Sequence, residues 1–280
     1  MPAAPRKPTR SRFCGKPTES NQGLSLFLLL VAGCAQLPPS AEPAFGVLGD
    51  APYTEAEVAR LEVVIDQINA QALEFVVHVG DIGSSSLACT DAWLLERKAQ
   101  FARIRHRFIL LPGDNEWKDC KDPLARLRRW REIFCETPRA FCEHRRWEAN
   151  GWVFVALNVP GHDNNVRHAE HGARMAAVLS FLRGAADDAR GKNGLMVFMQ
   201  ANPFFTLPRD GFASLRETLS ELGARMPGRV VLIHGDTHLH RDDEPLPGVR
   251  RIEVWGSPVV SWTRIPLTTG AGLPPARQQQ

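Results

Sequence analysis

Apolar runs that end in a glycine followed by an aspartate recur along this chain. Four runs end in this way, at Gly49-Asp50, Gly80-Asp81, Gly113-Asp114 and Gly235-Asp236. Each run has the length of a short buried strand, and the glycine permits a sharp turn where the strand ends. In α/β proteins, sites are built at the carboxyl ends of strands. The pattern therefore predicts four carboxylates gathered at one edge of a sheet, where divalent cations would offset their repulsion.

Predicted strands and helices alternate through most of the chain. Strand-like runs fall at residues 44–49, 74–80, 108–112, 152–158, 195–200, 229–235 and 251–256. Helical spacing of apolar positions falls at residues 54–71, 91–106, 122–134, 168–187 and 211–225. Thr54 and Glu57 have the spacing of a capping box at the start of the first helix. The order predicts one layered α/β domain, mostly parallel at first and mixed later.

The first 34 residues differ in character from the rest. A basic start precedes the apolar stretch 24–31, which is too short to span a bilayer, and Cys34 follows it. We interpret residues 1–34 as a secretory signal that resembles a bacterial lipobox, with Cys34 as the lipidated residue. An ordinary cleaved signal or an amphipathic anchor is the alternative. The expected location is the periplasmic side of a bacterial membrane, lipid-anchored, or secreted.

Three further segments follow this leader. Residues 35–43 are expected to form a linker, residues 44–268 the folded domain, and residues 269–280 a disordered tail. The leader carries five basic residues and one acid, so removing its +4 from the chain's +3 leaves about −1 for the mature protein. A near-neutral charge argues against nucleic acid as a partner.

Six cysteines are present, of which Cys14 would be lost with the leader and Cys34 lipidated. The remaining four are an even number in an exported chain, which favours two disulfides over a zinc site, because no Cys-x-x-Cys spacing occurs. The pairing we expect joins residues close in sequence. The pairs are Cys89 with Cys120 and Cys135 with Cys142.

Five motifs, taken in order, resemble the calcineurin-like metallophosphoesterase family over nearly the whole mature chain. The family pattern is Asp-x-His, Gly-Asp, Gly-Asn-His-Asp/Glu, a lone His after a strand, and Gly-His-x-His. The corresponding segments are Asp50-Ala-Pro52, Gly80-Asp81, Gly113-Asp-Asn-Glu116, Met199-Gln-Ala-Asn202 and Gly235-Asp-Thr-His238. The resemblance implies a layered α/β/β/α sandwich with mixed sheets flanked by helices.

The same resemblance implies a site for two divalent metal ions. Asp81 would bridge both ions, which would together hold the hydroxide that attacks a phosphoryl group. Asp50 and His238 would bind the first ion. The implied ligands of the second ion are Asp114, Gln200 and Asp236. Because oxygen donors replace most of the family's nitrogen donors, we expect Mn²⁺, Mg²⁺, Ca²⁺ or iron in preference to Zn²⁺.

Two departures from the family pattern affect the expected chemistry. Pro52 stands at the position of a metal-binding His and cannot ligate. Asn115 stands at the position of a catalytic His, and an amide can hydrogen-bond a phosphoryl oxygen but cannot act as a general acid. His240 or His234 could take over proton transfer, although a structural role is the alternative for each. The candidate catalytic residues are therefore Asn115 and His240.

The sequence predicts a metal-dependent phosphoesterase that hydrolyses an ester or anhydride of a small phosphorylated substrate. A purple acid phosphatase is disfavoured, because Ser84 stands where its tyrosine ligand would follow Asp81 by three residues. The alternative is an envelope lipoprotein that retains the fold and binds metal with weak or no catalysis. A nuclease is a third possibility, against which the near-neutral charge counts.

Overall fold

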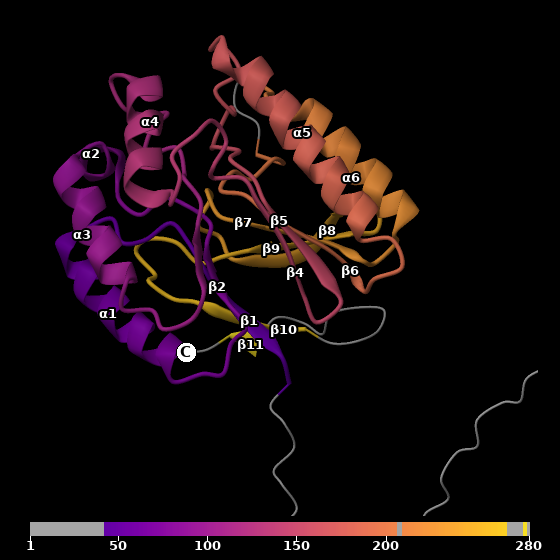
Figure 1. Ribbon diagram of the computed structural model, residues 1–280, viewed down its shortest axis with the longest axis horizontal. Helices are drawn as coiled ribbons and strands as arrows, with labels where there is room; N and C mark the ends of the chain where they lie inside the picture. Colours follow the sequence, from indigo (N-terminus) through magenta and orange to yellow (C-terminus); the bar gives the residue numbers. More distant parts are fainter. Residues whose placement is uncertain (1–41, 206–208, 268–276, 279–280) are drawn as a thin grey trace, which may run out of the picture. The chain divides into compact units, whose positions relative to one another are not determined.

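Two mixed sheets form the centre of the fold, with helices on their outer faces (Figure 1). The computed structural model describes residues 42–205, 209–267 and 277–278. The predicted leader, with Cys34, and nearly all of the predicted linker lie outside the described residues, and so does most of the predicted tail. The prediction of a layered α/β/β/α sandwich is confirmed.

The first sheet has the strand order β11-β10-β1-β2-β3. Strands β1, β2 and β3 are parallel to one another, and β10 and β11 extend the sheet beyond β1 in antiparallel pairing. Arg277 and Gln278 form β11 inside the segment predicted to be a disordered tail, so at these two residues the structure departs from that prediction. The strand bounds are β1 (Ala44–Leu48), β2 (Val76–His78), β3 (Phe108–Leu110), β10 (Thr263–Pro266) and β11 (Arg277–Gln278).

The second sheet has the order β4-β5-β6-β7-β9-β8. Its four central strands are parallel, and antiparallel hairpins place β4 and β8 at the edges. The β4–β5 turn is Asn150-Gly151 with φ of 49° and 76°, the left-handed pair that tight hairpins favour. The strand bounds are β4 (Arg145–Ala149), β5 (Trp152–Ala156), β6 (Gly194–Phe198), β7 (Val230–His234), β8 (Arg241–Leu246) and β9 (Val249–Glu253).

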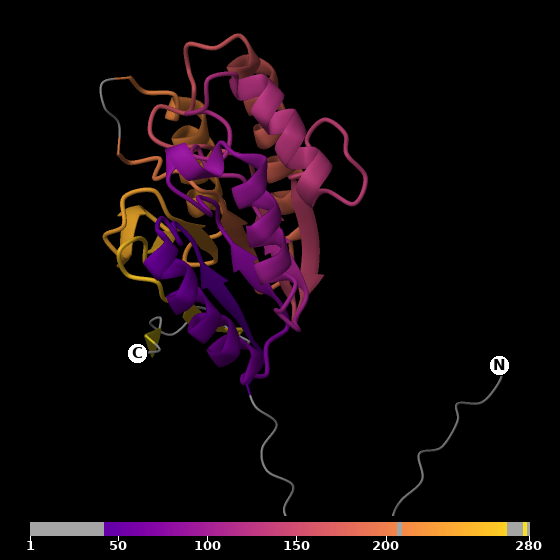
Figure 2. The same ribbon diagram turned by 90° about the vertical axis from the view of Figure 1, so that its left-hand side faces the viewer.

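The helices divide between the two outer faces. Helices α1 and α3 pack on the first sheet and lie in front of it in Figure 2, whereas α5 and α6 lie side by side over the second sheet. Each covered face buries aliphatic side chains of the helices against the strands. The helix bounds are α1 (Glu55–Asn69), α2 (Ser85–Ala88), α3 (Asp91–Phe101), α4 (Pro123–Phe134), α5 (Glu170–Asp188) and α6 (Ala213–Arg225).

Every strand and helix predicted from the sequence is present, with ends that differ by a few residues. Strands β4, β8, β10 and β11 and the one-turn helix α2 were not predicted. The two predicted disulfides are confirmed, Cys89–Cys120 and Cys135–Cys142. Among the described residues, we find no helix with the length and apolar character needed to cross a membrane.

Aromatic side chains fill the space between the two sheets. The ring of Phe154 is fully buried and lies 5.8 Å from that of Phe45, 4.9 Å from Phe75 and 5.4 Å from Trp147, measured between centroids. Phe45 and Phe75 come from the first sheet side and Phe154 from the second. This contact holds the two sheets together and so fixes how their strand ends approach one another.

Truncating Phe154 to alanine is expected to lower the free energy of unfolding by about 3–5 kcal/mol, because a large void would remain between the sheets. Urea denaturation followed by circular dichroism measures this. Phe181→Ala is the control, since Phe181 is 36% exposed on α5 and its loss should cost under about 1 kcal/mol. Equal losses in the two variants would contradict this description of the core.

Candidate metal centre

The four aspartates of the Gly-Asp motifs meet at one edge of the fold; we call Asp50, Asp81, Asp114 and Asp236 the acidic cluster. The first three follow the parallel neighbours β1, β2 and β3, so their side chains share one sheet edge. Asp236 follows β7 of the other sheet, and its backbone N–H donates to both carboxylate oxygens of Asp50, each at 3.1 Å. The sequence-predicted gathering of these carboxylates is therefore present.

The backbone turns sharply at these residues. Asp50, Asp81, Asp236 and His238 have φ of 49°, 57°, 80° and 56°, which is the left-handed region that most residues avoid. Such conformations cost energy and concentrate at functional sites. Gly235 allows the close approach of Asp50, because a Cβ at this glycine would overlap Asp50 Oδ2.

Glu116 is hydrogen-bonded to two of the loops that carry aspartates of the acidic cluster. Its fully buried carboxylate accepts hydrogen bonds from the backbone N–H of Asp81 at 3.3 Å, of Gly113 at 2.6 Å and of Ile82. Burial raises the pKa of Glu116 to about 7. Glu116 therefore fixes the loops after β2 and β3 relative to each other.

Burial and mutual repulsion act on the whole acidic cluster. Asp50, Asp81 and Asp114 are at most 6% exposed. Burial raises the pKa of each of the three, and repulsion from neighbouring carboxylates adds to this. Burial, with a smaller contribution from Asp114, raises the pKa of Asp236 to about 7. Ionising the cluster is therefore costly without a counter-charge, and bound cations would stabilise the ionised carboxylates.

His238 presents a nitrogen lone pair to the acidic cluster. Its Nδ1 lies 2.8 Å from the Ser257 carbonyl oxygen, which can only accept, so Nδ1 carries a hydrogen, and in the neutral ring the lone pair is therefore on Nε2. Nε2 lies 3.9 Å from Asp50 Oδ1. A histidine held through one ring nitrogen with the other exposed to carboxylates is a common arrangement of metal ligands.

Tyr53, the chain's one tyrosine, is a site residue that the sequence reasoning missed. Its hydroxyl donates to Asp81 Oδ2 at 2.9 Å and lies 3.4 Å from His238 Nε2. Burial, followed by repulsion from Asp81, raises the pKa of this phenol. Its position three residues after Asp50, directly beyond a strand end, is the signal that could have identified it.

The N-terminus of α1 holds Tyr53 in place. The Thr54 side chain accepts from the Glu57 N–H at 3.3 Å, as the predicted capping box requires. The Glu57 carboxylate, however, accepts from the Tyr53 N–H at 2.8 Å, one residue before the cap, and from the Ser257 hydroxyl at 2.9 Å. Glu57 therefore links Tyr53 to the loop that also orients His238.

Gln200 and Lys118 each contact one aspartate of the acidic cluster. Gln200 is fully buried, and its Nε2 donates to Asp81 Oδ2 at 3.2 Å, while its Oε1 accepts from the Gly161 N–H at 2.5 Å. The Lys118 ammonium, which the sequence reasoning also missed, lies 3.4 Å from Asp114 Oδ2. Its spacing of four residues from Asp114 was the available signal.

The two candidate catalytic residues have different surroundings. The Asn115 backbone N–H donates to Asp81 Oδ1 at 3.1 Å, but its amide donates to the Gly83 carbonyl at 3.0 Å and accepts from the Ser85 hydroxyl at 2.6 Å. His240 stacks on Trp255 with ring centroids 4.2 Å apart. Neither side chain has a described contact with an acidic-cluster side chain, and both catalytic roles stay predictions.

The side chains at this edge include donor types that divalent ions accept. Within the described ranges, no three His, Cys, Asp or Glu side chains are already close enough to hold an ion. The Tyr53 hydroxyl nevertheless contacts both Asp81 and His238. His238 Nε2 also lies 3.9 Å from Asp50 Oδ1, so two carboxylates and one imidazole, which are donors that first-row divalent ions accept, lie near one another. The assignment of all six predicted metal ligands stays a prediction.

Comparisons with known proteins identify the fold. No family model matches the chain, and no curated protein matches it. The solved dimetal phosphatase of Danio rerio aligns with a TM-score of 0.57 at 13% identity, over 80% of this chain and 92% of that one. This chain has the metallophosphoesterase fold.

Two further solved structures align over similar shares of this chain. GAP50, described as the anchor in the inner membrane complex of Plasmodium, has a TM-score of 0.56 at 11% identity, over 83% of this chain and 82% of that one. A purple acid phosphatase of yellow lupin has a TM-score of 0.54 at 11% identity, over 81% of this chain and 50% of its own length. At sequence identities this low, the comparisons show the shared metallophosphoesterase fold and nothing about activity.

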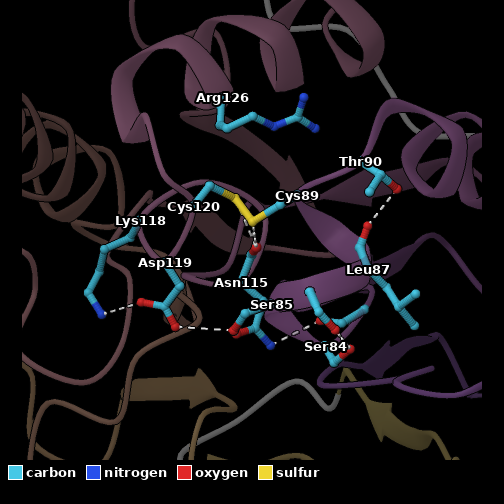
Figure 3. The surroundings of a disulfide bond; sticks show 12 residues. Ser84, Ser85, Leu87, Cys89, Thr90, Asn115, Lys118, Asp119, Cys120 and Arg126 are labelled. Carbon is cyan, nitrogen blue, oxygen red and sulfur yellow. Dashed lines mark hydrogen bonds and ion pairs between the residues drawn. A yellow bond between two sulfur atoms is a disulfide. The ribbon is translucent and has the colours of Figure 1, made fainter.

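The Cys89–Cys120 disulfide braces the loop that carries Asp114 and Asn115 (Figure 3). Its two sulfur atoms lie 3.8 Å and 3.6 Å from the backbone carbonyl oxygen of Asn115. The Ser85 hydroxyl, from α2, also contacts Asp119 Oδ2 at 3.3 Å. The disulfide thus connects α2 to the loop after β3.

Replacing Cys89 and Cys120 together with alanine is expected to lower the free energy of unfolding by about 4 kcal/mol, because the closed loop is long. The matched control removes Cys135 and Cys142, whose separation is 7 residues against 31, and should cost about 2.5 kcal/mol. Denaturant unfolding measures both. This expectation assumes that a disulfide stabilises the fold by restricting the unfolded chain, more so when the closed loop is longer. A larger loss of unfolding free energy from removing Cys135–Cys142 would contradict it.

In metal-free protein, Asp236→Asn is expected to become more stabilising as pH rises. The folded-state pKa of Asp236 is about 7, above its ordinary 3.8, so the folded chain binds a proton between these values that the unfolded chain does not. The free energy of unfolding of the wild type therefore falls as pH rises from about 4 to about 7. The variant's advantage should grow by about 2 kcal/mol from pH 5 to pH 8, measured by urea denaturation with chelator present.

Asp91→Asn is the control for this pH dependence. A hydrogen bond from Arg126 lowers the pKa of Asp91, which is therefore ionised in both states throughout this range. Its difference from wild type should stay constant between pH 5 and pH 8. An Asp236→Asn curve parallel to that of Asp91→Asn would show that Asp236 is not held in a repulsive environment.

Proposed function

We propose that this protein is a metal-dependent phosphoesterase that hydrolyses an ester or anhydride bond of a small phosphorylated substrate. The observation that carries the proposal is the convergence of the acidic cluster, of which Asp50, Asp81 and Asp114 are buried, with Nε2 of His238. Buried carboxylates without enough protein cations are stabilised by divalent ions. That two structural neighbours are named as phosphatases supports the choice of reaction.

Asp50, Asp81 and His238 would hold the metal ion. When bound, a divalent ion supplies Lewis-acid activation of water and of a phosphoryl oxygen. The chain's own residues set the geometry: Asp236 N–H orients Asp50, and the Asn115 N–H and Tyr53 hydroxyl orient Asp81. The left-handed backbone at these aspartates fixes the side chains at the strand ends before any ion binds.

One observation favours a second candidate, a metal-binding protein with weak or no catalysis. The Asn115 amide is engaged by Gly83 and Ser85, and it cannot donate a proton to a leaving group as an acid would. His240 stacks on Trp255. Substrates with good leaving groups need no such acid, so hydrolysis of aryl phosphates remains open to this site.

The proposed location is the periplasmic side of a bacterial membrane, with a lipid anchor on Cys34, or the extracellular space. Two disulfides are typical of proteins in an oxidising compartment. The signal-like sequence of residues 1–34 supports export.

Purified protein is expected to hydrolyse an aryl phosphate or an aryl phosphodiester when Mn²⁺ or Mg²⁺ is added. Asp81→Ala should reduce kcat/KM by at least about 100-fold, because it removes the central carboxylate of the ligand set. The control is Asp188→Ala, an exposed residue paired with Arg146 at 3.1 Å, which should retain wild-type activity. Activity that survives Asp81→Ala would refute the proposed site; metal binding without hydrolysis would favour the second candidate.

A further inference from the structure

Gln200 faces the acidic cluster with the wrong end of its amide for a metal ligand. The backbone N–H of Gly161 can only donate, so the atom it contacts at 2.5 Å must be the amide oxygen. The Nε2 group therefore faces Asp81 Oδ2, at 3.2 Å. An amide nitrogen has no lone pair for a metal ion, so at this position the chain offers Asp81 a hydrogen-bond donor.

Lys118 brings a positive charge to a second aspartate of the cluster, Asp114. Its ammonium lies 3.4 Å from Asp114 Oδ2, 3.1 Å from Asp119 Oδ1 and 4.0 Å from Asp163 Oδ1. The side chain is only 8% exposed, and a buried ammonium requires such partners. Figure 3 shows Lys118 joined to Asp119 on the loop that the Cys89–Cys120 disulfide braces.

The direction of the Gln200 amide and the position of the Lys118 ammonium both concern the place predicted for the second metal ion. Gln200 and Asp114 belong to the residues implied as ligands of a second ion, and the ammonium beside Asp114 would repel a dication placed there. The place predicted for the first ion contains no ammonium or guanidinium group within the described ion pairs, because the one basic partner of Asp50 among them is His238, whose Nε2 lies 3.9 Å from Asp50 Oδ1.

We propose that the centre binds a single divalent ion, through Asp50, Asp81 and His238, and that the Lys118 ammonium and the Gln200 amide together replace the second ion. This inference rests on the metal site of the proposed function. It makes Lys118 the second positive charge of the centre, beside the ion, where a phosphoryl oxygen of the substrate would be attracted.

Metal stoichiometry tests the inference without reference to activity. Full-length protein is saturated with Mn²⁺ by equilibrium dialysis, and bound metal is measured by elemental analysis and electron paramagnetic resonance. The wild type is expected to bind one Mn²⁺ per chain with the spectrum of an isolated ion. The double variant Lys118→Met/Gln200→His restores a nitrogen ligand and removes the ammonium, so it should bind two, with a spin-coupled spectrum.

Lys192→Met is the matched control, because Lys192 pairs with Glu148 away from the centre and its loss should leave one ion bound. Two coupled ions in the wild type would overturn this inference and leave the proposed function standing. One ion in a folded double variant would overturn the roles of Lys118 and Gln200. Absence of bound metal in the wild type would overturn both this inference and the proposed function. If the double variant does not fold, the wild-type spectrum alone decides between one ion and two.

Discussion

The repulsion among buried carboxylates is the constraint on which the rest of this structure depends. Asp50, Asp81 and Asp114 are brought to one sheet edge by three parallel strands, and Asp236 is added from the opposite sheet. Their raised pKa values express the cost of removing these charges from water and placing them together. Such a cluster is stabilised either by protonation of its carboxyl groups or by positive charge at that edge.

Several parts of the fold serve to hold this cluster in place. The aromatic contact between the sheets sets their approach, Glu116 joins two of the loops, and the Cys89–Cys120 disulfide braces the loop of Asp114. Stability of the core and geometry of the site are thus linked.

The strand-Gly-Asp pattern was sufficient to predict which carboxylates meet, because parallel strands place their ends at a common edge. Edge strands were harder: β4 has only one buried side chain, that of Trp147, so its apolar alternation is weak, although Asn150-Gly151 marks its hairpin. Tyr53 and Lys118 were missed because their roles depend on the approach of Asp81 and Asp114 in space. The direction of the Gln200 amide depends on Gly161, 39 residues away, which no local pattern reveals.

Anomalous diffraction from crystals soaked in Mn²⁺ tests the central claim most directly. A strong anomalous peak is expected within ligand distance of Asp50, Asp81 and His238. Absence of a peak at that position at saturating Mn²⁺, with the acidic cluster ordered and its hydrogen bonds unchanged, would contradict it.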